Sequence, residues 1–508
     1  MSLSWVDLVA FVLFVAFVVT VSMLASRRQH TGRDYFLAGR GLPWWLIGFS
    51  LVASNISTEH FVGMAGKGYE LGLAIASYEW MAAITLVVVA LFFLPRFLRA
   101  GIYTIPEFLE HRYGVVARTL MSAYMMLAYV FVALATVLYS GALALDAIFG
   151  LDIVLGIWLI GVLAGVYTIY GGLRAVVWSD LIQGIALIGG GILVTLLALH
   201  RVGGVEGFVE LAGDKLHTVL PADHPEMPWV AVFVGGLWIP NLFYWGLNQF
   251  ITQRTLAARS LSDGQRGIML AAAIKLLIPF IIVMPGIMAA GLFPDQISTG
   301  DQAYPVLIRE LLPAGLAGIM FAALFGAVMS TLDSLLNSAA TIFTMDLYTR
   351  HLRPRATAGD QIRTGRITTG VLVVAGCLWA PMVASAGSVF TYIQMFWGFI
   401  SPGIVAVFVL GFLWKRVPQW AAVGAMALGI PVYGVLLWRL PDVAFLHHMG
   451  ITFLVLVAFM AVSTLVKPAT ARTVTPAPEA FDLTPSGGAR WAGLAIVLAT
   501  VALYVVFR

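Results

Sequence analysis

The sequence is poor in charged residues and has almost no cysteine. Only 11% of its 508 residues are Asp, Glu, Lys or Arg, whereas a soluble globular protein carries about 25%. The chain is instead 60% hydrophobic, with a mean hydropathy of +0.94, which excludes a disordered protein and a soluble enzyme. The single cysteine, Cys377, excludes an intrachain disulfide and a paired-cysteine metal or redox motif. The composition predicts an all-α polytopic protein of the lipid bilayer.

The sequence also lacks a soluble domain and the motifs of an enzyme. Its longest loops, at about 200–227 and 467–487, are too short for a folded catalytic domain. No GxxxxGK[ST], HExxH or GxSxG motif occurs, and the basic residues are scattered over short loops. We therefore expect no enzyme activity, no nucleotide or nucleic-acid binding, and no obligate protein partner.

Apolar stretches long enough to span a bilayer recur along the chain. Fourteen are predicted, at about 5–25, 44–66, 72–98, 119–149, 152–170, 175–199, 228–251, 266–292, 315–347, 367–386, 388–413, 419–439, 445–466 and 488–507. Most Lys and Arg residues lie in the loops after the odd-numbered segments, and basic loops stay in the cytoplasm. We therefore predict a multi-pass protein of a bacterial cytoplasmic (inner) membrane, with both termini outside.

Residues 53–61, Ala-Ser-Asn-Ile-Ser-Thr-Glu-His-Phe, place a group of polar side chains near the middle of the second segment. Hydrocarbon offers such groups no hydrogen bonds, so a helix that faces lipid would not tolerate them. Ionisable residues at this depth, here Glu59 and His60, indicate a functional site. A break in the helix at this point would also free backbone carbonyl groups.

The seventh segment is interrupted in a similar way. It contains Gly235-Gly236, Pro240 and Asn241, and both glycine and proline weaken a helix. Two interrupted segments in corresponding positions of two halves point to a transporter binding site. They lie five segments apart, an odd number, which predicts an inverted 5+5 repeat of segments 2–6 and 7–11. The expected divisions are an N-terminal helix and loop at 1–43, repeats at 44–200 and 227–413, and peripheral helices at 414–508.

Two charged residues lie in equivalent segments of these repeats, Glu79 in the third and Lys275 in the eighth. Each alone would cost roughly 2.5–3.5 kcal/mol at the bilayer centre. Two interpretations are open: the residues face a shared polar cavity, or they form a purely structural pair. The aromatic neighbours Tyr78 and Trp80 fit the cavity and a sugar, which has apolar C–H faces and hydroxyl edges.

The ninth segment carries a polar stripe that includes Ser330 and Thr331 on one helical face. The stripe either allows close packing through small residues or supplies hydroxyl ligands to Na⁺, a hard cation that prefers oxygen. Asp180 either pairs with Arg174 at the interface or belongs to a second cation site or relay. Asp333 either faces the sodium route or hydrogen-bonds to neighbouring hydroxyls.

With these features the chain resembles the sodium/solute symporter family, closest to the bacterial sodium/galactose symporter and the animal sodium/glucose cotransporters. The resemblance covers nearly all of the chain and implies the leucine-transporter-type fold, with alternating access around a midplane site. The motifs that carry it are the string at 53–61, Tyr78-Glu79-Trp80, Tyr170-Gly171-Gly172-Leu173, Gln253-Arg254, Leu336-Asn337-Ser338 and Tyr392-Ile393-Gln394.

The resemblance also implies roles for individual residues. The substrate-binding positions would be His60, Glu79, Asn241, Tyr244, Lys275 and Gln394. The gates would be formed by Asn55, Met64, Tyr78, Trp245 and Phe390. The Na⁺ ligands would be the carbonyls of Ala53, Ile56 and Ala327 and the hydroxyls of Ser330 and Thr331. Glu59 is given no ligand and is expected to hold the broken helix in place.

Three positions bear on what the resemblance can imply. His60 stands where the bacterial galactose symporter has Gln, which leaves the preferred hexose open. Thr331 replaces the commoner Ser and keeps its hydroxyl, whereas Ala327 replaces a Ser that members with a second sodium site have. The expected function is Na⁺-coupled import of a monosaccharide of the glucose or galactose type. The alternatives are symport of myo-inositol, sialic acid or an amino acid and, more remotely, a sodium or solute sensor that transports nothing.

Overall fold

The computed structural model describes residues 5–25, 31–386, 389–470 and 481–508, and within these ranges it contains helices and no β-strand. This confirms the all-α prediction. The helices of the first half are α1 Trp5–Ala25, α2 Gly32–Leu37, α3 Trp44–Asn55, α4 Ala65–Leu71, α5 Ser77–Val88, α6 Leu94–Ala100, α7 Ile105–Tyr113, α8 Val115–Ala128, α9 Ala135–Phe149, α10 Ile153–Arg201 and α11 Gly204–Ala212. Those of the second half are α12 Trp229–Phe233, α13 Trp238–Leu242, α14 Gln249–Leu256, α15 Leu261–Leu292, α16 Ala303–Leu311, α17 Leu316–Ile342, α18 Ala358–Trp379, α19 Val389–Leu413, α20 Gln419–Arg439, α21 Phe445–Val466 and α22 Ala489–Val506.

Twelve helices among the described residues are long and apolar enough to cross a membrane, so the predicted count of fourteen is not confirmed. Two predicted spans account for the difference. The segment expected at 44–66 is broken and gives no single long helix. The segment expected at 152–170 gives the shorter apolar helix Ile153–Val166. It runs on into the rest of α10 through a kink at Gly172, whose φ of 56° and ψ of −173° suit only a residue without a Cβ.

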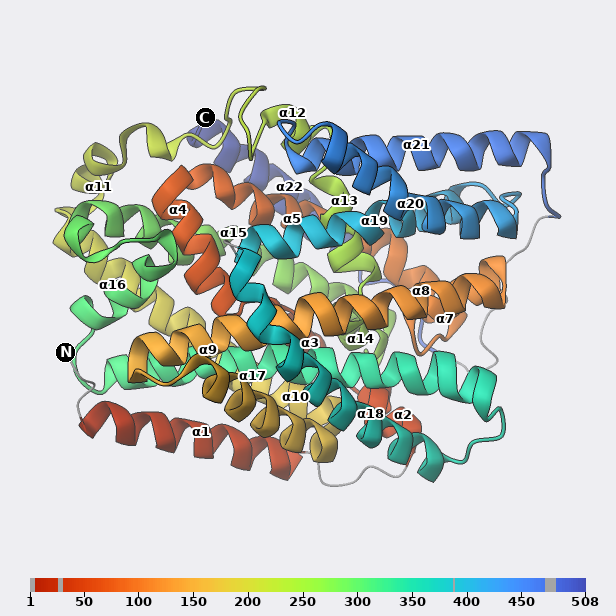
Figure 1. The fold of residues 1–508 in the computed structure, drawn as a ribbon, viewed down its shortest axis with the longest axis horizontal. Coiled ribbons are helices and arrows are strands. Elements are labelled where there is room, and N and C mark those ends of the chain that lie inside the picture. The colour runs from red at the N-terminus through yellow and green to blue at the C-terminus, as the bar shows by residue number, and fades with distance from the viewer. Residues whose placement is uncertain (1–4, 26–30, 387–388, 471–480) are drawn as a thin grey trace.

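The long helices lie side by side and enclose the broken segments (Figure 1). Helices α10 and α17 pack against each other most extensively, and α1 contacts both of them at one edge of the molecule. Helix α15 packs against α3, α4 and α5, while α19, α20 and α21 form a group of their own. The polar residues of the broken segments are therefore shielded from lipid by other helices.

The second predicted segment breaks where the polar string lies. Helix α3 ends at Asn55 because Ile56 has an extended backbone, with φ −78° and ψ 104°. The chain becomes helical again in a π-helical turn, Glu59–Met64, that leads into α4. A helix end leaves its last carbonyl groups without intrahelical partners. We call the interruption at residues 56–58 the first gap.

The seventh predicted segment breaks as well, but not at the proline. Pro240 lies in the first turn of the short helix α13, where its missing N–H has no intrahelical acceptor to lose. A π-helical turn, Phe243–Leu247, follows, and the chain then extends at Asn248, with φ −85° and ψ 121°, before α14 begins. The chain is also non-helical at residues 234–237, between α12 and α13, which is where the sequence predicted that Gly235-Gly236 would weaken the helix. We call the interruption at Asn248 the second gap.

Candidate functional site

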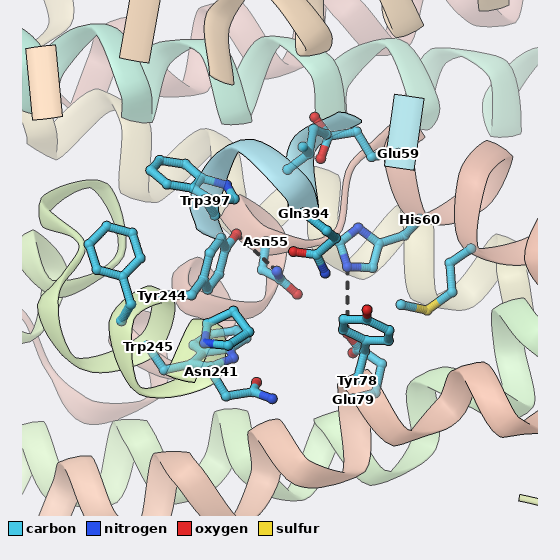
Figure 2. Close-up of a pocket in the computed structure, with 14 residues that line it drawn as sticks. Asn55, Glu59, His60, Tyr78, Glu79, Asn241, Tyr244, Trp245, Gln394 and Trp397 are labelled. Atoms are coloured by element: carbon cyan, nitrogen blue, oxygen red, sulfur yellow. Dashed lines mark hydrogen bonds and ion pairs between the residues drawn. The ribbon is translucent and has the colours of Figure 1, made fainter. Parts of the chain in front are cut away.

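A cavity lies between the two broken segments, and side chains from both of them line it (Figure 2). Five of the six predicted substrate-binding side chains reach it, namely His60, Glu79, Asn241, Tyr244 and Gln394. The full lining is Asn55, Glu59, His60, Met64, Tyr78, Glu79, Pro240, Asn241, Phe243, Tyr244, Trp245, Ile393, Gln394 and Trp397. The packing thus gathers residues that are hundreds of positions apart in the sequence.

Lys275, the sixth predicted residue, does not line the cavity but binds two residues that do, and these contacts pair its charge. Its side chain is 0% exposed. The Nζ group donates to Oε2 of Glu79 and to Oδ1 of Asn55, and it lies 5.0 Å from the ring centroid of Trp245. An unpaired buried charge is costly, so this arrangement keeps a lysine inside the membrane domain and orients the carboxylate that lines the cavity.

Tyr244 and Asn55 join the two broken segments across the cavity. Asn55 Nδ2 donates to the Tyr244 hydroxyl at 2.9 Å, as the resemblance implied, and Figure 2 shows this bond. The Tyr244 ring packs edge-on against Trp245, at 5.1 Å between centroids, and Phe250, at 5.3 Å. A tyrosine held in this way presents a ring face and an edge to a solute in the cavity.

His60 adds a second contact to Glu79. Its Nε2 lies 3.5 Å from Glu79 Oε1, on the opposite side of the carboxylate from Lys275. Its Nδ1 is buried and has no hydrogen-bond partner within the described ranges. Asn241, which also lines the cavity, donates from Nδ2 to the Leu237 carbonyl at 3.1 Å. The site therefore offers several hydrogen-bonding atoms that are already oriented by their neighbours.

The expected gate residues Asn55, Met64, Tyr78 and Trp245 line the same cavity, whereas the side chain of Phe390 lies outside the described residues. Sequence reasoning missed Trp397, which lies one helical turn beyond Gln394 on α19; that i+3 spacing could have indicated it. Glu59, expected only to hold the broken helix, also faces the cavity.

The expected sodium ligands gather at the first gap. Ala53, Ile56 and Ala327 line a small second cavity together with Gln183. Thr331 lies on the α17 side of the gap and donates from Oγ1 to the Ser54 carbonyl at 3.3 Å. Four of the five expected ligand residues thus lie together between α3 and α17, whereas the hydroxyl of the fifth, Ser330, donates to Asp180. Carbonyl and hydroxyl oxygens are the ligands that Na⁺ prefers.

Asp180 lies next to this region in a closed polar network. Its Oδ2 accepts from Ser54 at 3.0 Å and from Arg254 Nη2 at 3.2 Å, and its Oδ1 accepts from Ser330. The sequence interpretation that Asp180 pairs with Arg174 is wrong, because Arg174 is exposed and Asp180 is fully buried. A guanidinium from α14, after the second gap, is thus the partner of Asp180, a contact that spacing within one helix could not reveal.

Asp333 does not join the Asp180 network. Its Oδ1 accepts from the Thr168 hydroxyl at 2.6 Å, whereas its Oδ2 is buried and has no hydrogen-bond partner in the described part of the chain. Of the two interpretations left open by the sequence, the hydrogen bond to a neighbouring hydroxyl is the one observed. The free oxygen needs a separate explanation.

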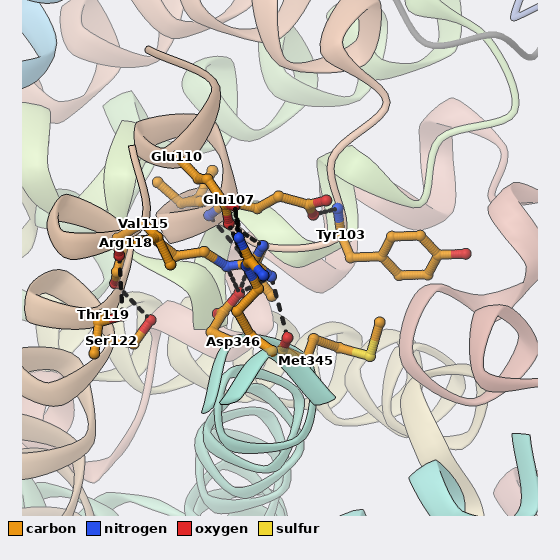
Figure 3. A network of polar contacts seen from close by, with 12 residues as sticks. Tyr103, Glu107, Glu110, Val115, Arg118, Thr119, Ser122, Met345 and Asp346 are labelled. Carbon is orange, nitrogen blue, oxygen red and sulfur yellow. Dashed lines mark hydrogen bonds and ion pairs between the residues drawn. The ribbon is translucent and has the colours of Figure 1, made fainter. Parts of the chain in front are cut away.

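A third polar network joins α7, α8 and the π-helical stretch Phe343–Leu352 that follows α17 (Figure 3). Arg118 binds Asp346 Oδ1 at 2.5 Å and Glu110 Oε2 at 2.7 Å, and Arg350 binds Glu110 Oε1 at 2.7 Å. Partial burial raises the pKa of Glu110, but hydrogen bonds from Arg350 and Arg118 outweigh it and hold the pKa below its ordinary value. None of these residues lines either of the cavities described above.

Several known proteins are similar to this chain. The model of the sodium:solute symporter family matches residues 35–429. The sodium/glucose cotransporter of Vibrio parahaemolyticus is 41% identical over 99% of this chain and 98% of its own. The human sodium/myo-inositol cotransporter 2 is 35% identical over 84% of this chain and 69% of its own. A solved structure of a Na⁺-coupled sialic acid symporter, substrate-bound and outward-open, is 25% identical, with a TM-score of 0.82 over 92% of this chain and 99% of that one.

Proposed function

The chain belongs to the sodium:solute symporter family, and from this premise we propose that it imports a monosaccharide of the glucose or galactose type. The family and its relatives are transporters, so the chain is a symporter in a lipid bilayer and not an enzyme, and Na⁺ is its coupling ion. The identity of the solute is the part that the proposal adds.

The pairing of Lys275 is the observation that carries the choice of solute. The described residues that line the cavity include no lysine or arginine. Lys275 lies behind this lining, and Glu79 and Asn55 already occupy its ammonium group. An anionic solute would need a free cation, because a buried charge without a partner is costly. A neutral polyhydroxylated ring fits better, since its hydroxyls can bond to His60 and Gln394 and its C–H face can stack on an aromatic ring.

The same observation ranks the alternatives. Sialic acid and zwitterionic amino acids carry a carboxylate and are disfavoured. myo-Inositol is neutral, of similar size and rich in hydroxyls, so it is the second candidate, and the 35% identity to the human sodium/myo-inositol cotransporter 2 favours it specifically. A sensor that transports nothing has no observation in its favour.

For the coupling ion we propose the region around the first gap, with the carbonyls of Ala53, Ile56 and Ala327 and the hydroxyls of Ser330 and Thr331 as ligands. An ion there would connect α3 to α17 and stabilise the broken segment in its sugar-binding arrangement. One Na⁺ moving inward gains about 2.3 kcal/mol per 100 mV of membrane potential, which concentrates a neutral sugar without ATP. Asp180 and Asp333 are not needed as ligands in this scheme.

Alternating access would then follow from movement of the two broken segments against the long helices. We assign segments 2–6 and 7–11 to inverted repeats, at 44–200 and 227–413, with 1–43 and 414–508 at the periphery. Both termini would lie outside the cytoplasmic membrane. When Na⁺ leaves inward, the first gap would loosen and the Asn55–Tyr244 bond could open toward the cytoplasm.

Uptake into proteoliposomes tests the proposal. Labelled glucose, galactose, myo-inositol and sialic acid are each offered with an inward Na⁺ gradient, and with a matched K⁺ gradient as the control. We expect accumulation of a hexose that requires Na⁺ and exceeds that of myo-inositol. Preferred uptake of myo-inositol would replace the sugar by the second candidate, and preferred uptake of sialic acid would overturn the argument from Lys275.

A further inference from the structure

A separate apolar cavity lies beneath the N-terminal helix. Helices α1, α10 and α17 enclose about 230 Å³, with Val15 and Val18 from α1, Leu163 and Val166 from α10, and Phe325 and Met329 from α17 in the wall. Figure 1 shows these three helices together at one edge of the molecule. Leu163 is 48% exposed and Val166 52% exposed on the outer surface of the helices. The cavity therefore borders the surface that faces lipid, so an apolar molecule in the bilayer can reach it.

Two hydrogen-bond acceptors without partners lie in this otherwise apolar lining. Asp333 is 1% exposed and Gln183 is 5% exposed, and both line the cavity. Asp333 Oδ2 and Gln183 Oε1 are each buried without a hydrogen-bond partner among the residues that the structure describes. The other carboxylate oxygen of Asp333 is held by Thr168 at 2.6 Å, which fixes the orientation of the group.

These two acceptors define what the cavity would bind. Buried polar groups pay a desolvation cost unless they are hydrogen-bonded, and a buried carboxylate pays most. An ammonium group supplies both the missing positive charge and up to three N–H donors. A dry apolar cavity of about 150 Å³ holds a benzene ring, so this larger cavity has room for a compact cage or bicyclic skeleton.

We propose that the cavity between α1, α10 and α17 is a binding site for a bulky apolar amine, with its ammonium group between Asp333 and Gln183 and its hydrocarbon skeleton against α1. The site is separate from the central cavity, with which it shares no lining residue.

The site is connected to the first gap through Gln183. This residue also lines the small cavity formed by Ala53, Ile56 and Ala327, and a Cβ on Gly326 would lie 2.8 Å from its Cγ. An amine that fixes Gln183 would restrict the neighbourhood of the proposed Na⁺ ligands. The amine therefore inhibits transport by raising the Na⁺ requirement, without competing with the sugar. This consequence rests on the proposed function, whereas the binding itself does not.

Binding is measured on the full chain in lipid nanodiscs with radiolabelled 1-aminoadamantane as the probe. 1-Adamantanol and adamantane-1-carboxylate serve as competitors of the same shape without the positive charge. We expect saturable amine binding, weaker displacement by the alcohol, and none by the carboxylate. If the unlabelled amine, the alcohol and the carboxylate all displace the probe equally, or if binding of the probe never saturates, the amine partitions into lipid and the proposal is overturned.

Two variants test the location of the site: one removes the charge of Asp333, and the other fills the cavity. Asp333→Asn keeps the shape of the side chain and should weaken amine binding about tenfold or more, because hydrogen bonds to charged groups contribute about 1.5–3 kcal/mol, while displacement by the alcohol persists. Val18→Trp fills the cavity from α1 and should abolish binding of both. Phe17→Trp, at the adjacent position that is 56% exposed on α1, is the matched control and should bind as the unmodified chain does.

The uptake assay then separates the two proposals. Amine binding that disappears in Val18→Trp but leaves Na⁺-driven uptake unaffected would confirm the site and remove its inhibitory role. If Val18→Trp and Asp333→Asn both bind the amine normally, the site is wrong, whatever the transported solute proves to be.

Discussion

The two gaps in the broken segments have nearly the same backbone geometry and differ in what fills them. At the second gap Asn248 is fully buried, and the Tyr129 hydroxyl donates to its Oδ1 at 2.5 Å. The same hydroxyl accepts from the Phe250 amide at 3.2 Å, so a protein side chain closes this gap. At the first gap Thr331 reaches one carbonyl, that of Ser54, and a cavity remains beside Ile56. An interrupted helix therefore becomes a candidate ion site only where the protein does not supply the missing partner itself.

The largest expected effect comes from removing the charge beside the first gap. Lys275→Met leaves Glu79 buried without its cation and should lower the free energy of unfolding by about 3–5 kcal/mol, with loss of sugar uptake. Thermal unfolding in detergent and proteoliposome uptake measure the two effects. The double variant Glu79→Gln with Lys275→Met should regain stability without regaining uptake. A stable single variant would show that the pair is not a buried ion pair.

A substitution at the second gap should change the stability of the protein but not its Na⁺ requirement. Tyr129→Phe removes the hydroxyl that bridges Asn248 and the Phe250 amide, and leaving such groups unpaired costs about 1–3 kcal/mol. We expect a lower unfolding midpoint with an unchanged Na⁺ requirement for uptake. Tyr139→Phe, on the helix that follows, is the matched control. A shift in the Na⁺ requirement would mean that the second gap also takes part in ion coupling, and the contrast between the gaps would fail.

The first gap should respond in ion dependence. Ser330→Ala removes one proposed Na⁺ ligand, and losing about 1.4 kcal/mol of binding free energy raises the Na⁺ concentration needed for half-maximal uptake about tenfold. The matched control is Ser338→Ala on the same helix, whose hydroxyl donates to Gln253 Oε1 at 2.6 Å. Equal Na⁺ dependence in both variants would count against the proposed ligand.

The smallest effect is expected outside both gaps, at Glu110. Its pKa is lowered in the folded chain by Arg350 and Arg118, against the effect of partial burial. The resulting stability is fully present above the ordinary carboxyl pKa of about 4.3 and disappears as the pH falls through the lowered folded value. Glu110→Gln should reduce this loss of unfolding free energy at acid pH by roughly 1 kcal/mol or less.

The unfolding midpoint is followed against pH, with exposed Glu210→Gln on α11 as the control. If the unfolding midpoint falls at acid pH in the same way in Glu110→Gln and in the unmodified chain, the ion pairs of Glu110 do not contribute to stability. Uptake at neutral pH should be the same in all three proteins.

Much of the fold and of the cavity was predictable because membrane insertion imposes local rules. A long apolar run must be a helix, and an intramembrane acid and base must face something polar, so Glu79 and Lys275 could be identified as a pair. The polar string at 53–61 marked the first gap for the same reason. The count of fourteen spans was less secure, since a broken helix and a kink at Gly172 change how long each helix is.

The sequence by itself determined that this chain is a bundle of membrane helices with a polar interior, and which residues compose that interior. Only the tertiary structure decided their partners: Arg254 and not Arg174 beside Asp180, Trp397 in the cavity wall, Tyr129 in the second gap, and a cavity left beside Ile56 in the first. Spacing along one helix fixes which residues share a face. Which face meets which neighbour depends on the packing of helices that are distant in the chain, and that packing decides where a freed backbone group remains available to an ion.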